Sequence, residues 1–248
     1  MSGKTVYAVG IGPGSPELLT PQAAKVLTRC TAIAGYRPYL EQIAELTRGK
    51  KLIPGGMRQE IARCTAALDA VLAGETVAVV SSGDAGVYGM AGLLLELTEE
   101  ERYSSIDVEV IPGVTAALSC AALLGAPLMN DFAVLSLSDL MTPKAMIERR
   151  LTAIAETDLP AVLYNPASRS RHDMLEFAVS VFRKAGGDLP GALVRDAYRP
   201  AQKVAFFTLD RFPYDEVQMT TTVIIGNSQT RLRRNRLYCL RGYRPGLR

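Results

Sequence analysis

Short, continuously apolar runs alternate along the chain with segments whose apolar residues recur at helical spacing. The runs are rich in Val, Ile and Leu, which is typical of strands that are covered on both faces. Strands are predicted at residues 5–9, 76–80, 107–111, 132–137, 161–164, 192–195, 203–209 and 221–225. Since helical segments separate many of these strands, the pattern predicts an α/β fold with mostly parallel sheets.

Two helices are predicted in the first half of the chain. Thr20 is a good N-cap residue, Pro21 suits the first helical position, and the helix continues to Arg29. Residues 57–73 form the second helix, which ends at Gly74. Its predicted buried stripe is Ile61, Cys64, Leu68 and Leu72.

Two more helices are predicted in the second half. Thr142 and Pro143 repeat the Thr-Pro start, and Ile147, Leu151 and Ile154 then make an apolar stripe. Ser170 is predicted to cap a helix that ends at the glycine pair 186–187. Its apolar positions are Leu175, Ala178, Val181 and Phe182.

Eight strands are too many for one doubly wound sheet in a chain of this length, so two α/β domains are predicted, 1–126 and 127–248. Little helical pattern separates the strands after Gly191, which indicates antiparallel pairing there. The arginine-rich segment 231–236 is predicted to be a solvent-exposed hairpin or a strand at a dimer edge, with anion binding as the alternative.

Composition narrows the possible partners. The net charge of +3 is too small for a general nucleic-acid-binding protein. The four cysteines are widely spaced, which argues against a metal site and for buried, reduced thiols in a cytoplasmic protein. No signal peptide is recognised at the start, and no apolar run reaches the ~20 residues that span a membrane.

A glycine-rich loop follows the first predicted strand. Gly10, Gly12 and Gly14 are spaced as in a dinucleotide-binding loop, but that fingerprint requires a further glycine where this chain has Ser15. No acidic residue ends a second strand about 20 residues further on. The loop therefore does not fit a dinucleotide, which argues against an oxidoreductase.

Four junctions share one character, because small, polar or glycine-rich residues directly follow an apolar strand. They are 10–15, 81–88, 112–117 and 164–166. In open α/β sheets, ligands bind outside the carboxyl ends of the strands. The four junctions are therefore predicted to converge on one crevice.

Taken in order, these motifs resemble the tetrapyrrole methylases. The resemblance rests on Gly10-x-Gly12-x-Gly14-Ser15-Pro16-x-Leu18-Leu19-Thr20, on Gly83-Asp84-x-x-x-Tyr88, and on Pro112-Gly113-Val114-Thr115 with Ala121 and Gly125. Segments 131–143, 164–166 and 221–228 resemble the branch that methylates carbon 17 of a precorrin, on ring D, and contracts the ring in cobalamin synthesis.

The resemblance implies S-adenosylmethionine as cofactor, a tetrapyrrole (precorrin) substrate, two αβα domains with the active site in a trough between them, and a homodimer. It implies that the cofactor is bound by Pro13, Ser82, Gly83, Asp84, Val87, Thr115, Ala116, Asn165, Phe207, Thr220 and Thr221. Asp84 is expected to bond a polar group of the cofactor or to oppose its positive charge. The last four residues are expected on the adenine side, through backbone contacts.

No single catalytic group is assigned. Methyl transfer depends mostly on holding the two reacting groups in line, whereas ring contraction also needs proton transfers. The residues considered for that role are His172, Asp84, Ser136 and Ser138, and those considered for the substrate carboxylates are Arg169, Arg171, Arg195 and Arg199. A sister methylase acting at another ring carbon and a non-catalytic tetrapyrrole-binding protein stay open, as does whether the substrate carries cobalt.

Overall fold

The computed structural model describes residues 4–167 and 173–243. The chain forms two compact units, the first up to Ala116 and the second from Ala117 onward. The domain boundary predicted from the sequence, after residue 126, lies one helix further along the chain than this division. That helix, α6 (Ala116–Leu124), belongs mostly to the second unit, where the Cys120 thiol forms a hydrogen bond with Thr222 and the Ala117 N–H donates to the Tyr164 hydroxyl at 2.7 Å.

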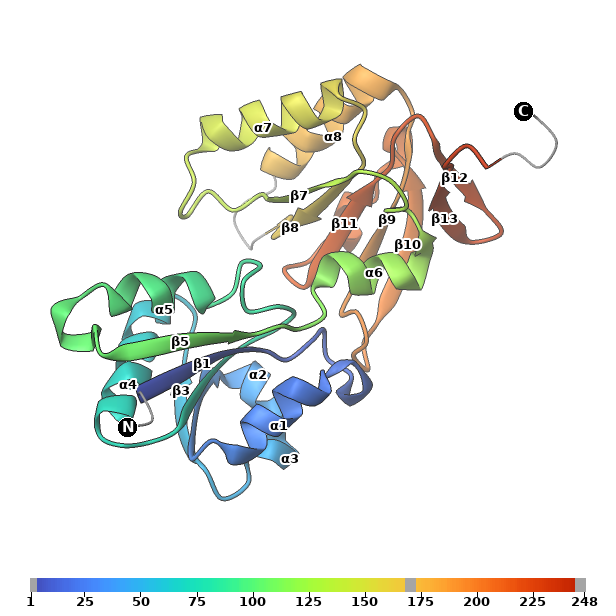
Figure 1. Ribbon diagram of the computed structural model, residues 1–248. Helices are drawn as coiled ribbons and strands as arrows, with labels where there is room; N and C mark the ends of the chain where they lie inside the picture. Colours follow the sequence, from blue (N-terminus) through green and yellow to red (C-terminus); the bar gives the residue numbers. More distant parts are fainter. Residues whose placement is uncertain (1–3, 168–172, 244–248) are drawn as a thin grey trace. The chain divides into compact units, whose positions relative to one another are not determined.

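The first unit contains a five-stranded, fully parallel sheet in the order β3-β2-β4-β1-β5 (Figure 1). Val6 in the interior strand β1 lies opposite Val77 on one side and Val108 on the other. Because the strands are parallel, all of their carboxyl ends meet at one edge of the sheet. The strands are β1 (Lys4–Gly10), β2 (Ala32–Tyr36), β3 (Lys51–Gly55), β4 (Val77–Ser81) and β5 (Ile106–Ile111).

Helices cover both faces of this sheet. One buried cluster joins α4 and α5 to the sheet, and a second joins α1 and α2 to the other face. Helix α1 begins as predicted, since the Thr20 Oγ1 accepts a hydrogen bond from the Ala23 N–H at 3.1 Å. The helices are α1 (Pro21–Arg29), α2 (Arg37–Gln42), α3 (Ala44–Thr47), α4 (Glu60–Leu72) and α5 (Ala91–Thr98), with 3-10 turns η1 (Pro16–Leu18) and η2 (Glu101–Tyr103).

The buried face of α4 differs from the prediction. Cys64 and Leu68 are buried as expected, but Ile61 is 65% exposed. The inward face instead includes Arg63 and Ala67. The stripe is rotated because Ala67, Ala70 and Val71 pack into the buried cluster on the sheet, and Arg63 lies on this same inward side of the helix.

The second unit contains a mixed five-stranded sheet in the order β10-β9-β11-β8-β7. Only β7 and β8 are parallel, and the pairs among β8, β9, β10 and β11 are antiparallel, as predicted for the segment after Gly191. The sheets are therefore mostly parallel in the first unit alone. The strands are β7 (Ala133–Ser136), β8 (Ala161–Tyr164), β9 (Pro190–Arg195), β10 (Lys203–Thr208) and β11 (Thr221–Ile225).

Helices α7 (Lys144–Glu156) and α8 (Asp173–Gly186) lie side by side on one face of this sheet (Figure 1). Helix α7 begins after Pro143 with no side-chain cap, so Thr142 does not cap it as predicted, although Ile147 and Leu151 are buried. The predicted cap Ser170 lies outside the described residues. Helix α8 ends as predicted before Gly187, whose φ is +76°.

A small sheet completes the second unit. It is formed by β6 (Gly125–Ala126), β12 (Thr230–Arg233) and β13 (Arg236–Cys239). Strands β12 and β13 pair antiparallel, and their arginines are exposed, which confirms the hairpin predicted for the arginine-rich segment. Two 3-10 turns, η3 (Leu209–Arg211) and η4 (Tyr214–Glu216), follow β10.

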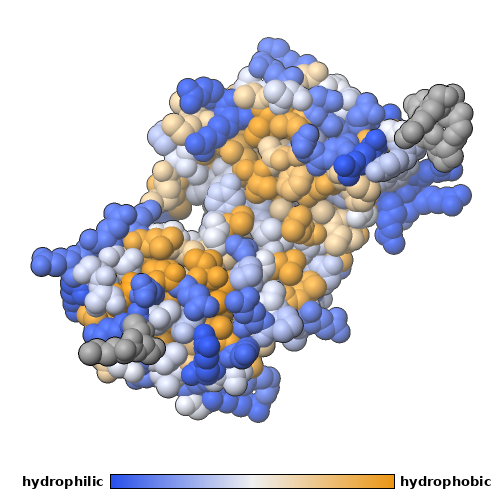
Figure 2. All heavy atoms as spheres, in the orientation of Figure 1, coloured by the Kyte–Doolittle hydropathy of each residue, from blue (hydrophilic) through white to orange (hydrophobic). Residues whose placement is uncertain are grey.

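Apolar side chains are also exposed at the edge of the first sheet. Strand β5 is an edge strand, and its residue Val110 is 42% exposed. Leu95 on α5 is 50% exposed. Figure 2 shows hydrophobic residues gathered on the part of the first unit where Figure 1 shows α5 and β5. An unpaired, partly apolar strand edge is a surface that can accept another chain.

The four cysteines are all free and buried, as predicted. Within residues 4–167 and 173–243, no group of acidic, histidine and cysteine side chains is arranged to hold a metal ion. No helix in this part of the chain is both long and apolar enough to cross a membrane.

Candidate functional site

Two loops of the first unit cross at the carboxyl edge of the parallel sheet. The Ile11 N–H donates to the Ser81 carbonyl at 2.9 Å. Gly12 and Gly83 then exchange two backbone hydrogen bonds, of 3.0 and 2.7 Å. The glycine loop after β1 is therefore bridged, backbone to backbone, to the loop after β4.

The turn after β5 packs against the same crossing. A Cβ atom on Gly10 would lie 2.7 Å from both the Gly83 carbonyl oxygen and the Gly113 nitrogen. A Cβ atom on Gly113 would overlap the Gly83 carbonyl oxygen. Three segments far apart in sequence thus approach so closely that glycine is required at both positions. We refer to this close-packed crossing of backbone segments as the glycine cradle.

The Asp84 carboxylate ties this cradle together. Its Oδ1 accepts a hydrogen bond from the Gly86 N–H at 2.8 Å, and its Oδ2 accepts one from the Gly113 N–H at 2.9 Å. Asp84 therefore joins the loop after β4 to the turn after β5. Each oxygen keeps a second acceptor site, so these bonds leave the carboxylate able to accept another donor.

Seven of the predicted cofactor-binding residues lie on these three segments. Pro13 is buried in the glycine loop, while Val87 is 36% exposed in the loop after β4. Ser15, at the position where a dinucleotide loop would have glycine, caps the short helix η1 by accepting the Glu17 N–H at 3.3 Å. The seven residues at this edge are Pro13, Ser82, Gly83, Asp84, Val87, Thr115 and Ala116.

A second edge, in the second unit, carries Asn165. Asn165 directly follows β8 and adopts a φ of +52°. Its side-chain amide donates to the Ser136 Oγ at 2.9 Å, and the same oxygen accepts the Ser138 N–H at 3.2 Å. The carboxyl ends of β7 and β8 are linked in this way, and two of the residues considered for proton transfer, Ser136 and Ser138, lie beside Asn165.

Thr220 and Thr221 lie at this second edge as well. Strand β11 runs antiparallel to β8 and β9, so its first residues lie at the carboxyl ends of both neighbours. The Thr220 carbonyl accepts the Asp196 N–H at 3.4 Å. Thr221 is 3% exposed and its Oγ1 accepts the Gln218 N–H at 2.9 Å, so its side chain holds a turn while its backbone borders the edge.

The structure does not bring Phe207 to this edge. Phe207 pairs with Gly191, and Gly191 pairs with Ile225, so it lies at the opposite end of the sheet. Its ring is buried and packs against Phe212 with ring centroids 4.6 Å apart. Because β10 runs antiparallel to β9, the last residues of β10 lie far from the carboxyl ends of β8 and β9.

The turn after β9 lies at the second edge, where Phe207 was expected. Asp196 and Tyr198 have φ values of +48° and +58°, and Ala197 between them is buried. Arg195 ends β9 beside this turn, with its Nε 3.8 Å from the Asp196 Oδ2. The sequence analysis missed this turn, although polar residues directly after an apolar strand were the signal used at the other four junctions.

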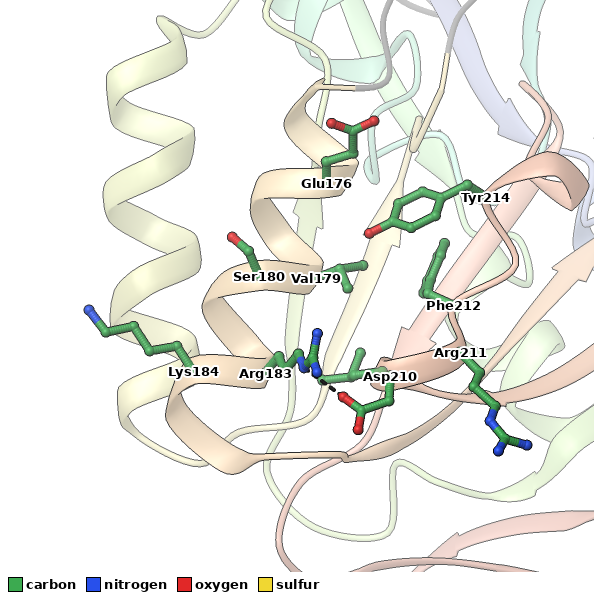
Figure 3. A pocket seen from close by; sticks show the side chains of 10 residues that line it. Glu176, Val179, Ser180, Arg183, Lys184, Asp210, Arg211, Phe212 and Tyr214 are labelled. Atoms are coloured by element: carbon green, nitrogen blue, oxygen red, sulfur yellow. Dashed lines mark ion pairs between the residues drawn. The ribbon is translucent and has the colours of Figure 1, made fainter.

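A groove of about 580 Å³ lies between α8 and the turns after β10 (Figure 3). Arg183 and Asp210 form an ion pair across it, with Nε and Oδ1 2.6 Å apart. Tyr214 lines this groove, and its pKa is raised, mainly by burial and also by the negative charge of the nearby Glu176. This groove lies at the Phe207 end of the sheet and includes none of the predicted site residues.

Three candidates for catalysis or substrate binding, Arg169, Arg171 and His172, lie outside the described residues.

The fold and these edges define an α/β protein of two units with glycine-rich and polar loops at strand ends and no dinucleotide-type loop. The model of the family "Tetrapyrrole (Corrin/Porphyrin) Methylases" matches residues 5–213, and the chain belongs to this family. The resemblance inferred from the ordered glycine motifs is thereby confirmed, and the protein is a methyltransferase.

Relatives in the same family are similar over nearly the whole chain. A probable cobalt-factor III C(17)-methyltransferase of Salmonella typhimurium is 41% identical over 95% of this chain and 98% of its own length. A precorrin-3B C(17)-methyltransferase of a Sinorhizobium species is 36% identical over 92% of this chain and 91% of its own. The crystal structure of the methyltransferase CobJ has a TM-score of 0.90 at 34% identity, covering 96% of this chain and all of that chain.

Proposed function

We propose that the protein transfers a methyl group from S-adenosylmethionine to carbon 17 of a precorrin and contracts the macrocycle. The observation that carries this proposal is the similarity, over 95% of the chain, to a relative named for C(17) methylation. The names of two relatives differ in their substrates, cobalt-factor III and precorrin-3B, so both are substrates to test.

The cofactor is proposed to bind at the glycine cradle of the first unit. S-adenosylmethionine has no phosphate, so a glycine loop without the dinucleotide spacing suits it. The close approach at Gly10, Gly83 and Gly113 fixes the loops after β1, β4 and β5 against one another. The half-buried Ser82 and the exposed Gly86 and Val87 beside it leave polar and apolar groups that an adenosine can contact. Asp84 holds the cradle and supplies the negative charge that a sulfonium favours. When bound, the cofactor supplies an electrophilic methyl group.

Residues of the second unit are proposed to complete the binding of the adenosine. Asn165 and Thr220 are exposed at the carboxyl ends of β8 and β9 in the second sheet. The turn at Ala197 directly follows β9 at this edge, so it is proposed to contact the adenosine instead of Phe207. The leaving thioether is neutral and needs no acid, so the protein contributes mainly by positioning. A homodimer and a cytoplasmic location are further parts of the proposal, supported by the family resemblance.

The substrate is proposed to be anchored by its carboxylates. A precorrin carries acetate and propionate side chains, and an arginine fork binds a carboxylate through two hydrogen bonds. Arg195 is suited to this because it lies at the second edge beside Thr221, to which it is paired in the sheet.

The direct experiment is incubation with S-adenosylmethionine and either precorrin-3B or cobalt-factor III, followed by mass spectrometry. We expect a mass gain of one methyl group with at least one of them. Uroporphyrinogen III is the control, because a sister methylase that acts on the unmethylated ring would use it instead. Methylation of the control alone, or methylation at a carbon other than 17 by NMR, would contradict the proposal.

A further inference from the structure

Helix α4 carries a buried arginine without an acidic partner. Arg63 is only 6% exposed, and its Nε is buried with no hydrogen-bond partner. Its Nη1 donates to the Gly56 carbonyl at a long 3.3 Å, and its Nη2 lies 3.6 Å from the Met90 sulfur, which is a weak acceptor. Among the residues that the structure describes, no carboxylate forms an ion pair with Arg63.

A guanidinium stays charged at all relevant pH values and offers five N–H donors in a fixed fork. Burying such a charge is unfavourable unless an anion and good hydrogen bonds accompany it. Glu60, one helical turn away, instead accepts the Arg58 N–H at 3.2 Å. The positive charge of Arg63 is therefore uncompensated by its own helix.

The Arg63 side chain lies near the carboxyl ends of β3 and β4. Gly55, over which the guanidinium lies, is the last residue of β3. A Cβ atom there would be 2.6 Å from Nη1, so glycine leaves the space that the guanidinium fills. Met90 is fastened to the end of β4, since its N–H donates to the Ser81 Oγ at 3.0 Å. Arg63 thus lies at the carboxyl edge of the sheet, beside the loop that carries Ser82 to Val87.

We propose that Arg63 is an anion-binding residue of the active site and receives a carboxylate of a bound ligand. The proposal rests on the proposed function, whose two ligands both carry carboxylates: the tetrapyrrole has several and the methionine part of the cofactor has one. The flexible Met90 side chain covers the guanidinium through a weak contact. An incoming carboxylate replaces that contact with charge-assisted, bidentate hydrogen bonds.

The test is Arg63→Met, which keeps a long apolar stem and removes the fork. Calorimetry measures the Kd of S-adenosylhomocysteine, and steady-state kinetics measure kcat and KM for the tetrapyrrole. We expect one ligand to bind at least about tenfold more weakly, the typical loss of a charge-assisted hydrogen bond. A raised KM for the tetrapyrrole assigns the carboxylate to the substrate, and a raised Kd assigns it to the cofactor.

Thermal unfolding separates this role from a structural one. Removing an uncompensated buried charge should leave the melting temperature unchanged or raise it. A lower melting temperature with both constants unchanged would overturn the proposal. Arg48→Met is the matched control, because Arg48 is exposed and pairs with Glu45 at 2.7 Å, and it should alter neither constant.

Arg63→Lys keeps the test informative if Arg63→Met does not fold. Lysine keeps the charge without the fork, so we expect a folded protein with weakened binding of the same ligand; unchanged binding in this variant would also overturn the proposal. Failure of the proposed function is distinguishable, because the unaltered protein would then methylate neither precorrin-3B nor cobalt-factor III.

Discussion

At the scale of single residues, the Asp84 carboxylate joins two loops that are distant in sequence. Both of its carboxylate oxygens accept backbone N–H groups, one from its own loop and one from the turn after β5. The sequence indicated that an acidic residue stands beside a glycine. It did not indicate that Asp84 also binds the Gly113 N–H, because Gly113 lies 29 positions further along the chain.

We predict that Asp84→Asn weakens both folding and cofactor binding. The amide keeps one acceptor oxygen but places an NH₂ group against a backbone N–H, which leaves a donor unsatisfied. The expected loss is about 1–3 kcal/mol of unfolding free energy, together with weaker binding of S-adenosylhomocysteine. Urea unfolding and calorimetry measure these effects.

The matched control for Asp84→Asn is Glu45→Gln, which removes a carboxylate from an exposed ion pair and should cost less than about 1 kcal/mol. If Asp84→Asn behaves like the control in both measurements, the carboxylate is not what joins the two loops.

At the scale of elements, pattern and composition predicted the strands and their directions better than the register that pairs them. Strands β8 and β11 have the predicted bounds. Strands β2 and β3 were missed, because Gly35 and Pro54 interrupt their short apolar patterns. The strand containing Phe207 and its antiparallel pairing were both predicted. The end of the sheet at which Phe207 lies was not, because it depends on the partner strand and the register, in which Phe207 faces Gly191, and not on local residues.

Helix α1 offers a test of a local prediction. Thr20 accepts the Ala23 N–H, and its hydroxyl also donates to the Pro112 carbonyl at 3.3 Å, so it joins the helix start to the turn after β5. We expect Thr20→Ala to lower the unfolding free energy by about 1 kcal/mol, the usual value of an N-cap. Thr28→Ala, later in the same helix, removes only a bond to the Ala24 carbonyl and should stay within about 0.5 kcal/mol of the unaltered protein. Equal effects in chemical denaturation would show that Thr20 is not an effective cap.

At the scale of the whole molecule, buried thiols make stability depend on alkaline pH. Burial raises the pKa of Cys30, Cys64 and Cys120 from 9.0 to about 11. Between these values the unfolded chain loses thiol protons that the folded protein keeps, so the unfolded state binds fewer protons. The unfolding free energy must therefore fall as pH rises from about 9 to about 11.

Urea unfolding across that pH range measures the decline. Burial and the Asp69 hydrogen bond also raise the pKa of Tyr103, which acts in the same direction. Cys64→Ala separates the contributions, since it should make the decline shallower. A stability that is flat from pH 9 to 11 would contradict the thiol argument.

The whole protein should also distinguish its ligands by mass action. At about 100 times its dissociation constant, a ligand adds about 2.7 kcal/mol of stability. We expect S-adenosylhomocysteine to raise the melting temperature and NADH to leave it unchanged, since Ser15 caps η1 where a dinucleotide loop needs glycine. A shift with NADH alone would reverse the cofactor assignment.

The position of β1 between β4 and β5 has a consequence for synthesis on the ribosome. Val6 finds its partners only at Val77 and Val108, so the first strand must wait for about 70 further residues to emerge before one side is paired. At synthesis rates of about 5–20 residues per second, this apolar strand is exposed for several seconds. Nascent chains stalled before β4 should therefore be the ones that chaperones capture, and those stalled well after β5 should have buried it.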